Sequence, residues 1–343
     1  MQPITFSTNK HFVPVANKPL IYYPLETIAE AGIKEVAITY NPGWLDMAKK
    51  FIGDGSKWGL NVTYVLQEKP AGLANIFQVC EDYLKGESFL LHLGDNIFVD
   101  GIENLVKHFE KSKPNGLVAM VHSKDNTRLG VPYFDEKGKL VRYVEKPSNP
   151  PHDFAIPGIY FFDNNVFKCF EGRDAIKSSE RGEYEISSPF QWLIDNGYRV
   201  EVLEYKGKWL DPGKFDDWMS SNAYLLEKRT KGINQSNFGS DVTLVGKVDI
   251  GKGCKIKDTE IIGPTSLGNG VEIISSKIGP NVSISDDCLI EKTEIENSIL
   301  MSNVKIRSIT GKIKDSMIGT GTEIEKNNNY HTFLVGDKCQ IKL

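Results

Sequence analysis

A six-residue spacing of aliphatic side chains in the last third of the chain restricts the fold more than any other feature of the sequence. Strands of an antiparallel sheet would alternate every two residues instead. A hexapeptide period is typical of a parallel β-helix, in which each repeat places its aliphatic side chain in a narrow interior. The sequence therefore predicts a left-handed parallel β-helix over residues 240–343. The aliphatic residues with this spacing are Leu244, Ile250, Ile256 and Ile262, and then Ile278, Ile284 and Ile290.

The first 230 residues follow a different pattern, in which short β-rich runs alternate with helical stretches. The runs are 36–40, 62–66, 89–93 and 117–121, and the helical stretches are 20–31, 44–51, 73–84 and 102–110. Such alternation predicts an α/β domain whose Rossmann-like, mostly parallel sheet is covered on both faces. Ligands of these sheets bind beyond the carboxyl ends of the strands. Residues 67–72 and 94–96 are therefore the first places to look for a site.

Two further segments complete the predicted organisation. The runs 131–134 and 139–144 flank the turn DEKG and predict an antiparallel hairpin, and 158–162 reads as another strand. Residues 231–239, KGINQSNFG, are polar and rich in Gly, Asn and Ser, so we expect a linker there. The predicted domains are thus 1–230 and 240–343.

Composition excludes several classes of protein. The chain has 343 residues, which suits two domains, with 40% hydrophobic and 25% charged residues. A net charge of −4 argues against nucleic acid as the main partner. No apolar run is long enough to cross a membrane, and the first residues lack a signal-peptide pattern, so we expect a cytoplasmic protein. The five cysteines are far apart, and we expect neither a zinc site nor disulfides.

A series of short motifs runs in order along the first domain. They are PIT at 3–5 with Lys10, PVANKP at 14–19, Gln67 with GLA at 72–74, LGDN at 93–96, GV at 130–131, VEKP at 144–147, RGEYEI at 181–186 and WLDPG at 209–213. With a β-helical tail that closes on LVGD at 334–337, this series resembles the sugar nucleotidylyltransferase family, in the long form of its glucose-1-phosphate thymidylyltransferase branch. The resemblance covers essentially the whole chain. It implies a Mg²⁺-dependent transfer of a nucleoside monophosphate from dTTP to glucose 1-phosphate, which gives dTDP-glucose and pyrophosphate.

That reaction needs few catalytic groups. The sugar phosphate is already an anion, so the protein has to align the substrates and neutralise charge rather than supply a general base. Mg²⁺ takes one or two carboxylates from a protein. Asp95 and Asp211 match the two metal-binding aspartates of the family, although Asp95 alone reads equally well as a turn residue. Lys10 and Lys146 match its phosphate-facing cations.

The remaining site positions follow from the same resemblance. Gln67 and Gly72 match positions that contact thymine or uracil, and Asp95 is part of the nucleotide site. A glutamine side chain can both donate and accept hydrogen bonds, as a pyrimidine edge requires. A polar loop before a helix is the alternative reading of Gln67.

The sugar-phosphate site is implied at four positions. They are Gly130, Glu145, Lys146 and Arg181. Glu145 would bind sugar hydroxyls. Neighbours in a strand point to opposite faces, so Glu145 and Lys146 can act together only if the strand has ended. Taken alone, a Glu-Lys-Pro sequence at a strand end is read as solvated surface.

One part of the family pattern does not occur in the chain. The family begins with a β-strand and a GxGTR loop whose backbone N–H groups hold the triphosphate. Here Met1 falls where that loop has just ended. We expect a sheet without its central strand, two strand edges without a partner, and little or no transferase activity if the protein begins at Met1.

Three alternatives to a thymidylyltransferase remain open. A uridylyltransferase or another sugar-phosphate nucleotidylyltransferase would have the same fold, because thymine and uracil differ by one methyl group. A non-catalytic regulatory or assembly subunit would explain the missing loop but not the retained site residues. An acyltransferase activity of the β-helix is disfavoured, because it has few coils and one histidine, His331. We expect the β-helix to support rigidity or homo-oligomer assembly instead.

Overall fold

The computed structural model describes residues 4–6 and 8–326, which fold into two compact units. Unit 1 contains the described residues up to Ile21 and those from Leu210 onward, and unit 2 is Tyr22–Trp209. Pro3, His331 and the motif at 334–337 lie outside the described residues. None of the helices in the described ranges has the length and hydropathy that a membrane crossing requires.

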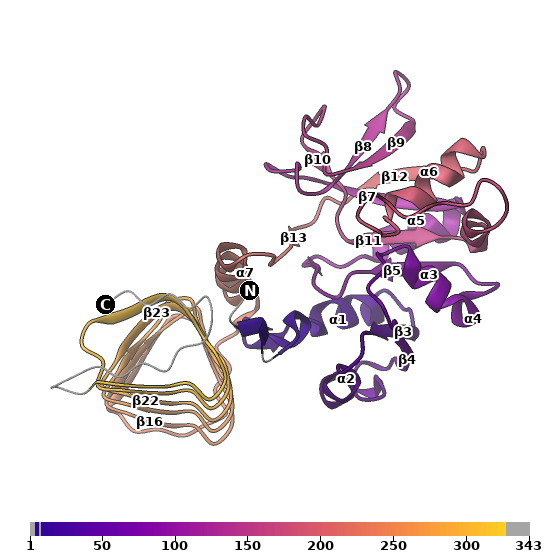
Figure 1. Ribbon diagram of the computed structural model, residues 1–343. Coiled ribbons are helices and arrows are strands. Elements are labelled where there is room, and N and C mark those ends of the chain that lie inside the picture. Colours follow the sequence, from indigo (N-terminus) through magenta and orange to yellow (C-terminus); the bar gives the residue numbers. More distant parts are fainter. Residues whose placement is uncertain (1–3, 7, 327–343) are drawn as a thin grey trace. The chain divides into compact units, whose positions relative to one another are not determined.

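Unit 2 is an α/β structure whose main sheet has the strand order β10-β7-β11-β5, with β12 beside β7 (Figure 1). β5, β7 and β12 run in one direction, and β11 lies between β5 and β7 in the opposite one. The predicted runs 89–93, 117–121 and 158–162 all form strands of this sheet. The bounds are β5 Phe89–His92, β7 Gly116–His122, β10 Phe154–Ala155, β11 Ile159–Phe162 and β12 Val200–Glu204.

The other two predicted parallel strands form a separate pair. β3 (Glu35–Tyr40) and β4 (Asn61–Leu66) are parallel and, within the described residues, pair only with each other. β5 pairs only with β11 in the same part of the chain. The unit therefore presents strand edges of β3, β4 and β5 whose backbone groups have no strand partner there.

The predicted helices also form, with one division. The stretch 73–84 becomes two short helices because Cys80 leaves the helical conformation, with φ −102° and ψ 7°. The helix before the linker and the one after RGEYEI were not predicted. The bounds are α1 Tyr22–Glu30, α2 Leu45–Ile52, α3 Asn75–Val79, α4 Glu81–Leu84, α5 Glu103–Ser112, α6 Ser187–Asp195 and α7 Phe215–Arg229.

The β8–β9 hairpin contains predicted site residues, and a short strand, β6, lies next to another. β8 (Gly130–Phe134) and β9 (Leu140–Glu145) form the expected antiparallel hairpin. Its turn is closed by Asp135, whose Oδ1 accepts from the amides of Lys137 and Lys139 at 2.9 and 2.8 Å. β6 (Ile97–Phe98) follows the LGDN motif.

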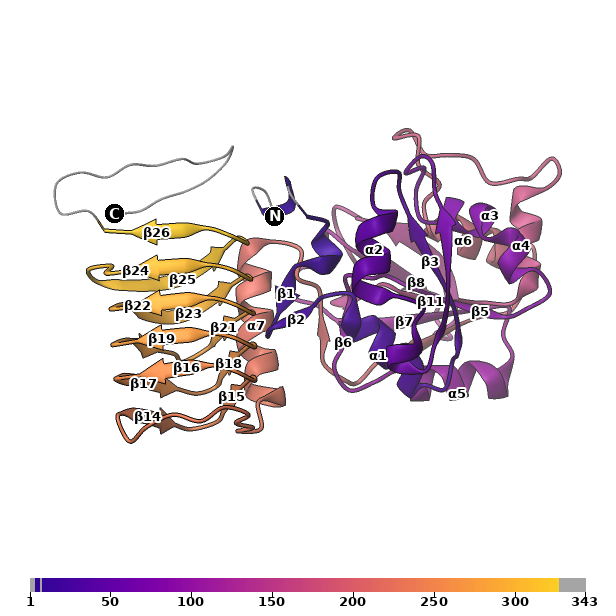
Figure 2. The same ribbon diagram turned by 90° about the horizontal axis from the view of Figure 1, so that it is seen from below.

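Unit 1 is built on a parallel β-helix, as predicted, and its strands stack in parallel from coil to coil (Figure 2). The strands are β14 Val242–Val245, β15 Val248–Ile250, β16 Lys255–Lys257, β17 Thr259–Ile262, β18 Thr265–Leu267, β19 Glu272–Ile274, β20 Lys277–Ile278, β21 Val282–Ile284, β22 Leu289–Glu291, β23 Glu294–Leu300, β24 Lys305–Arg307, β25 Lys312–Ile318 and β26 Glu323–Glu325.

The repeat of the β-helix is 17 residues per coil in its first coils, and this corrects the predicted register. Residue 248 pairs with 265, and 265 pairs with 282. Such a coil has three faces, of six, six and five residues. A constant six-residue spacing is therefore one residue too long on the five-residue face. Ile261, with no exposed surface, occupies the interior in place of the predicted Ile262, which is half-buried. Leu244 pairs with Ile261 but is 37% exposed, because β14 belongs to the end coil.

Corner residues hold successive coils together. At one corner Asp258, Ser275 and Lys292 have φ of 47°, 49° and 47°, in the left-handed region that turns the chain sharply. Corner side chains bind the next coil: Ser275 Oγ donates to Asp258 Oδ2 at 2.9 Å, and the Asp258 amide donates to Asp241 Oδ2 at 2.9 Å.

The segment predicted as a linker is bound to the first coil. The carboxylate of Asp249 accepts hydrogen bonds from the amides of Lys231, Gly232 and Ile233. The division of the chain into functional domains at 231–239 stays a prediction, and the compact units themselves divide at 21/22 and 209/210.

The N-terminal residues of unit 1 form a small hairpin. β1 (Pro14–Val15) and β2 (Lys18–Pro19) are antiparallel, and the two residues between them, Ala16 and Asn17, have φ of 47° and 62°, as in a type I′ turn. A short 3₁₀ helix, Lys10–Phe12, precedes the hairpin. The helix α7 lies beside the β-helix in both views of the molecule (Figures 1 and 2).

The 17-residue register makes a direct prediction. Ile261→Ala removes a fully buried side chain and should lower the free energy of unfolding by about 2–5 kcal/mol. Ile262→Ala, one residue later on the outward side, should lower it by about 1 kcal/mol or less. Urea denaturation of the two variants measures both values. Equal losses, or a larger loss at Ile262, would contradict the register.

Candidate functional site

Asp95 lies directly after β5 and is held by its neighbour in the LGDN motif. Asn96 Nδ2 donates to Asp95 Oδ1 at 3.0 Å. Asn96 itself is buried, and its Oδ1 accepts from the Gly158 amide at 3.1 Å and from Trp209 Nε1 at 2.7 Å. Sequence reasoning gave Asn96 no role. Its position between β5, β11 and the WLDPG motif makes it the residue that orients the half-buried carboxylate of Asp95.

A buried histidine stands next to the same motif. His92 Nδ1 lies 2.9 Å from the Leu93 carbonyl oxygen, and burial lowers its pKa to about 4. Its ring is therefore neutral at pH 7 and adds no positive charge beside Asp95. Its Nε2 has no hydrogen-bond partner within residues 4–6 and 8–326. The sequence gave no signal for this residue, because the histidines are scattered singly.

Gln67 follows β4 and is buried and fixed through both its backbone and its side chain. Its amide donates to the Tyr40 carbonyl at 2.8 Å, and its carbonyl accepts from Asn41 Nδ2 at 3.0 Å. The side-chain Nε2 donates to Asn75 Oδ1, at the start of α3, at 3.1 Å. A side-chain amide held this way keeps one orientation, which recognition of a base edge requires.

Gly72 is required for a backbone contact with a second motif. It has φ +98°, and a Cβ at this position would lie 2.5 Å from the oxygen and 2.6 Å from the nitrogen of Tyr184. Hydrogen bonds join the two segments on either side: the Tyr184 amide donates to the Ala71 carbonyl at 2.8 Å, and the Ala74 amide donates to the Tyr184 carbonyl at 3.0 Å. The structure thus gives a reason for this glycine other than a close approach to a base.

Gly130 and Glu145 are partners across the β8–β9 hairpin. A Cβ at Gly130 would overlap the ring of Tyr143, so the glycine makes room for this buried tyrosine. Burial raises the pKa of Glu145, and a hydrogen bond from Tyr143 partly opposes this rise. Sequence reasoning missed Tyr143, which gave no signal because it reads as an ordinary strand residue.

The structure brings Glu145, Lys146 and Arg181 close enough to influence one another. Burial raises the pKa of Glu145, and the neighbouring Glu185 raises it further, while Lys146 and Arg181 act in the opposite direction. Arg181 Nη2 forms an ion pair with Glu185 Oε1 at 2.6 Å. Two carboxylates and two cations therefore meet at the end of β9.

Lys146 lies beside Glu145 because the strand ends between them. β9 stops at Glu145, and Lys146 has φ 49°, in the left-handed region. This breaks the alternation that would send the two side chains to opposite faces.

The last two predicted site residues belong to unit 1. Lys10 begins the 3₁₀ helix, whose N-terminal Asn9 accepts from the His11 amide at 3.0 Å. Asp211 lies in the loop before α7, and its carbonyl accepts from the Gly213 amide at 2.7 Å. The predicted phosphate and metal residues Lys10 and Asp211 are thus in one unit, while the other predicted site residues are in the other.

The side chains that could act as metal ligands suit an ion that is bound mostly by substrate oxygens. Among residues 4–6 and 8–326 no three His, Cys, Asp or Glu side chains converge as a metal site. Mg²⁺ needs only one or two protein carboxylates when phosphate oxygens and water supply the remaining ligands. Asp95 and Asp211, with one carboxylate each, are the predicted metal residues.

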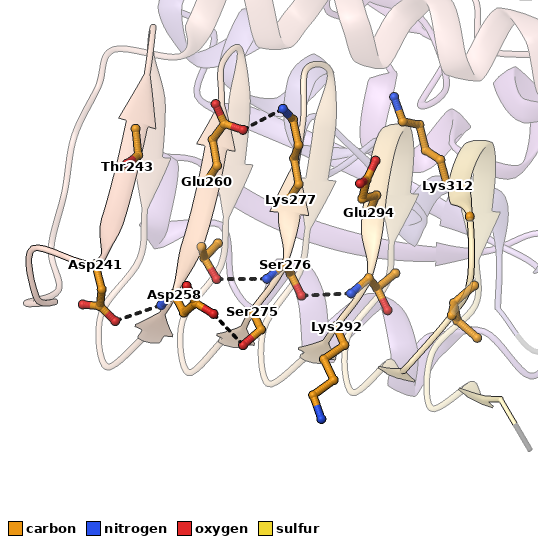
Figure 3. A pocket seen from close by; sticks show the side chains of 14 residues that line it. Asp241, Thr243, Asp258, Glu260, Ser275, Ser276, Lys277, Lys292, Glu294 and Lys312 are labelled. Carbon is orange, nitrogen blue, oxygen red and sulfur yellow. Dashed lines mark hydrogen bonds and ion pairs between the residues drawn. The ribbon is translucent and has the colours of Figure 1, made fainter.

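A groove of about 680 Å³ on the outside of the β-helix contains none of these residues (Figure 3). Its polar side chains form ladders along successive coils and bind one another. Lys277 Nζ lies 2.6 Å from Glu260 Oε2, and Ser275 Oγ donates to Asp258. These contacts account for the groove as a structural feature of the stacked coils.

Comparison with known proteins defines the class. Residues 1–228 match the family model described as nucleotidyl transferase, and residues 275–343 match the GlmU-like C-terminal hexapeptide model. The chain belongs to the nucleotidyl transferase family and is a nucleotidyltransferase with a hexapeptide β-helix.

Several proteins of known name are similar to this chain. The glucose-1-phosphate thymidylyltransferase of Streptomyces antibioticus is 34% identical, with 100% of this chain and 96% of the relative covered. The low-salt glycan biosynthesis nucleotidyltransferase Agl11 of Haloferax volcanii is 31% identical, with 100% of this chain and 96% of the relative covered. A crystal structure from Bacillus anthracis, titled for glucose-1-phosphate thymidylyltransferase and containing sucrose, has a TM-score of 0.61 and 31% identity, covering 70% of this chain and 92% of that one.

The contact between Gly72 and Tyr184 can be tested with a matched glycine. Gly86 has φ +90° and no atom within 4 Å of a Cβ built on it, so Gly86→Ala should cost only the backbone term, about 1–2 kcal/mol. Gly72→Ala adds the overlap with Tyr184 and should cost about 3 kcal/mol or more. Chemical denaturation measures both. Similar losses would mean that the two segments separate easily.

The raised pKa of Glu145 makes stability depend on pH with a defined sign. The folded state binds this proton more tightly than the unfolded chain, so the ionised carboxylate opposes folding at neutral pH. Glu145→Gln should therefore raise the free energy of unfolding at pH 7. The gain should shrink as the pH falls through the folded pKa and vanish below the ordinary value of 4.5. Urea unfolding between pH 4 and pH 8 measures this difference, with Glu136→Gln in the exposed turn of the same hairpin as the control.

Proposed function

We propose that the protein transfers a thymidylyl group from dTTP to glucose 1-phosphate, giving dTDP-glucose and pyrophosphate in a Mg²⁺-dependent reaction. The observation that carries the proposal is the full-length similarity to glucose-1-phosphate thymidylyltransferases. Two site residues of unit 2 support it, because Gln67 and Asp95 follow β4 and β5, and ligands of α/β sheets bind beyond the carboxyl ends of such strands.

In this reaction an oxygen of the sugar phosphate attacks the α-phosphorus of dTTP, and pyrophosphate leaves. Asp95 and Asp211 would hold Mg²⁺, which neutralises the charge that builds up on the phosphate oxygens. Lys10 and Lys146 would add fixed positive charge at the same groups. No proton has to be removed from the nucleophile, which agrees with the absence of a histidine–carboxylate pair from the proposed set.

Substrate recognition falls to the remaining residues of unit 2. Gln67, oriented by Asn75, would read the edge of the thymine, and the loop at Gly72 would line the base. Glu145 would accept hydrogen bonds from sugar hydroxyls. The nearby Lys146 and Arg181 favour its ionised, accepting form against the effect of burial.

The proposal is tested by pyrophosphate release from the purified chain. The assay contains Mg²⁺, glucose 1-phosphate and one of dTTP, UTP, CTP, ATP or GTP, and it is run on the 343-residue chain and on a form extended by the coding sequence upstream of Met1. We expect the highest rate with dTTP, and loss of activity with EDTA that Mg²⁺ restores. Asp95→Asn should lower kcat/KM by about 100-fold or more. Asp82→Asn, an exposed carboxylate on α4, should change it less than twofold.

The results of this assay distinguish the proposed function from its alternatives. A higher rate with UTP would assign a uridylyltransferase. No release from either form, with dTTP still bound, would assign a non-catalytic role. Full activity of Asp95→Asn would remove Asp95 from the metal site.

A further inference from the structure

A single side-chain amide in α7 joins three segments that are far apart in the sequence. Asn222 has no exposed surface. Its Oδ1 accepts from the Ala16 amide at 2.9 Å and from Ser283 Oγ at 2.9 Å, and its Nδ2 donates to the Asn281 carbonyl at 3.3 Å. All four residues belong to unit 1. The amide thus connects the N-terminal hairpin, the helix and a coil of the β-helix.

The hairpin is held by α7 at two points. Ala16 is a turn residue between β1 and β2, and its amide points to Asn222 rather than to the strand partner. One helical turn earlier, the buried Trp218 donates from Nε1 to the Pro14 carbonyl at 2.9 Å. Val15, between these contacts, is fully buried.

The held hairpin fixes the segment that carries Lys10. Outside the two strands, the Leu20 amide donates to the Val13 carbonyl at 3.1 Å, and the Ile21 amide donates to the His11 carbonyl at 2.8 Å. This ladder ends one residue after Lys10. The backbone position of Lys10 therefore depends on the hairpin and, through it, on Asn222.

The β-helix supplies the fixed end of this connection. Ser283 lies in β21 and is buried, and its register partners are Ser266 in the preceding coil and Ile299 in the next. The N-terminal segment lies near the β-helix at a second place, because a Cβ added to Gly319 would be 3.3 Å from Ile4 Cδ1. A buried amide is costly unless all its hydrogen bonds are made, and here both ends are used to fix one arrangement.

We propose that Asn222 is a positioning residue through which the β-helix holds Lys10 in place for phosphate chemistry. The proposal rests on the proposed function, because that function assigns Lys10 to the triphosphate. In this role the β-helix is part of the support of the active site and not only an assembly module. The coils stacked on β21 set the position of Ser283, which sets Asn222 and then the hairpin.

Asn222→Ala tests the connection, with Ser276→Ala as the matched control. Ser276 is a buried hydroxyl in another coil, whose Oγ donates to the Ile274 carbonyl at 2.8 Å. In the form of the chain that releases pyrophosphate, we expect Asn222→Ala to lower kcat about tenfold or more, because small displacements of a charged group strongly affect such transfers. The KM for glucose 1-phosphate should stay within twofold, because Glu145, Lys146 and Arg181 belong to unit 2. Ser276→Ala should leave both constants within twofold.

If Asn222→Ala unfolds, Asn222→Asp and Ser283→Ala still test the proposal. Asn222→Asp retains an oxygen acceptor for Ala16 and should restore part of kcat. Ser283→Ala removes one of the two donors to Oδ1 and should lower kcat less than Asn222→Ala does. Kinetics are measured well below the unfolding midpoint of each variant.

Amide hydrogen exchange separates failure of this inference from failure of the proposed function. Asn222→Ala should speed exchange in peptides that cover residues 8–21 by about tenfold or more, with unit 2 unchanged. If neither the 343-residue chain nor the extended form releases pyrophosphate, the proposed function fails, and the exchange result alone decides whether Asn222 holds the segment. Unchanged exchange in folded Asn222→Ala overturns the inference. Faster exchange with unchanged kcat shows that the segment is held but that Lys10 does not need it, which also overturns the positioning role.

Discussion

Backbone hydrogen bonds between successive coils, which are 17 residues apart before β21 and 16 after it, are the interaction on which unit 1 depends. They fix the position of β21 relative to its neighbours. Ser283 and Asn281 on that coil bind Asn222, Asn222 binds the turn at Ala16, and the hairpin leads to Lys10. A regular stack far along the chain thus determines where an N-terminal lysine lies.

Unit 2 depends on a balance of charge at the end of β9. Burial disfavours the ionised form of Glu145, and Glu185 does so as well, whereas Lys146, Arg181 and the hydroxyl of Tyr143 favour it. Beside Asp95 lie a histidine that is neutral at pH 7 and the side-chain amide of Asn96. In the proposed reaction, the first carboxylate contacts neutral sugar hydroxyls and the second contacts a metal, so the two surroundings suit different ligands.

Periodicity predicted the fold well, and local conformation accounts for what it missed. Residues 36–40 and 62–66 form β3 and β4, and the six-residue spacing predicted the β-helix. The spacing placed Ile262 inside instead of Ile261, because one interior step of each coil is five residues long, and a constant six-residue spacing does not show where that step falls. The motifs named Glu145, Lys146 and Arg181 as parts of one site, and the fold places them close enough to influence one another. Asn222 could not be found this way, because a lone asparagine in a helix looks like a solvated residue until its distant partners are known.

The backbone of Lys146 has a consequence for how this protein tolerates change. A left-handed conformation costs a residue other than glycine about 1–2 kcal/mol. Glycine or asparagine would relieve that cost, and either would remove the ammonium group beside Glu145. Selection for heat resistance alone would therefore tend to replace this lysine, and a variant library screened only by melting temperature would lose the cation that the proposed function assigns to the substrate phosphates.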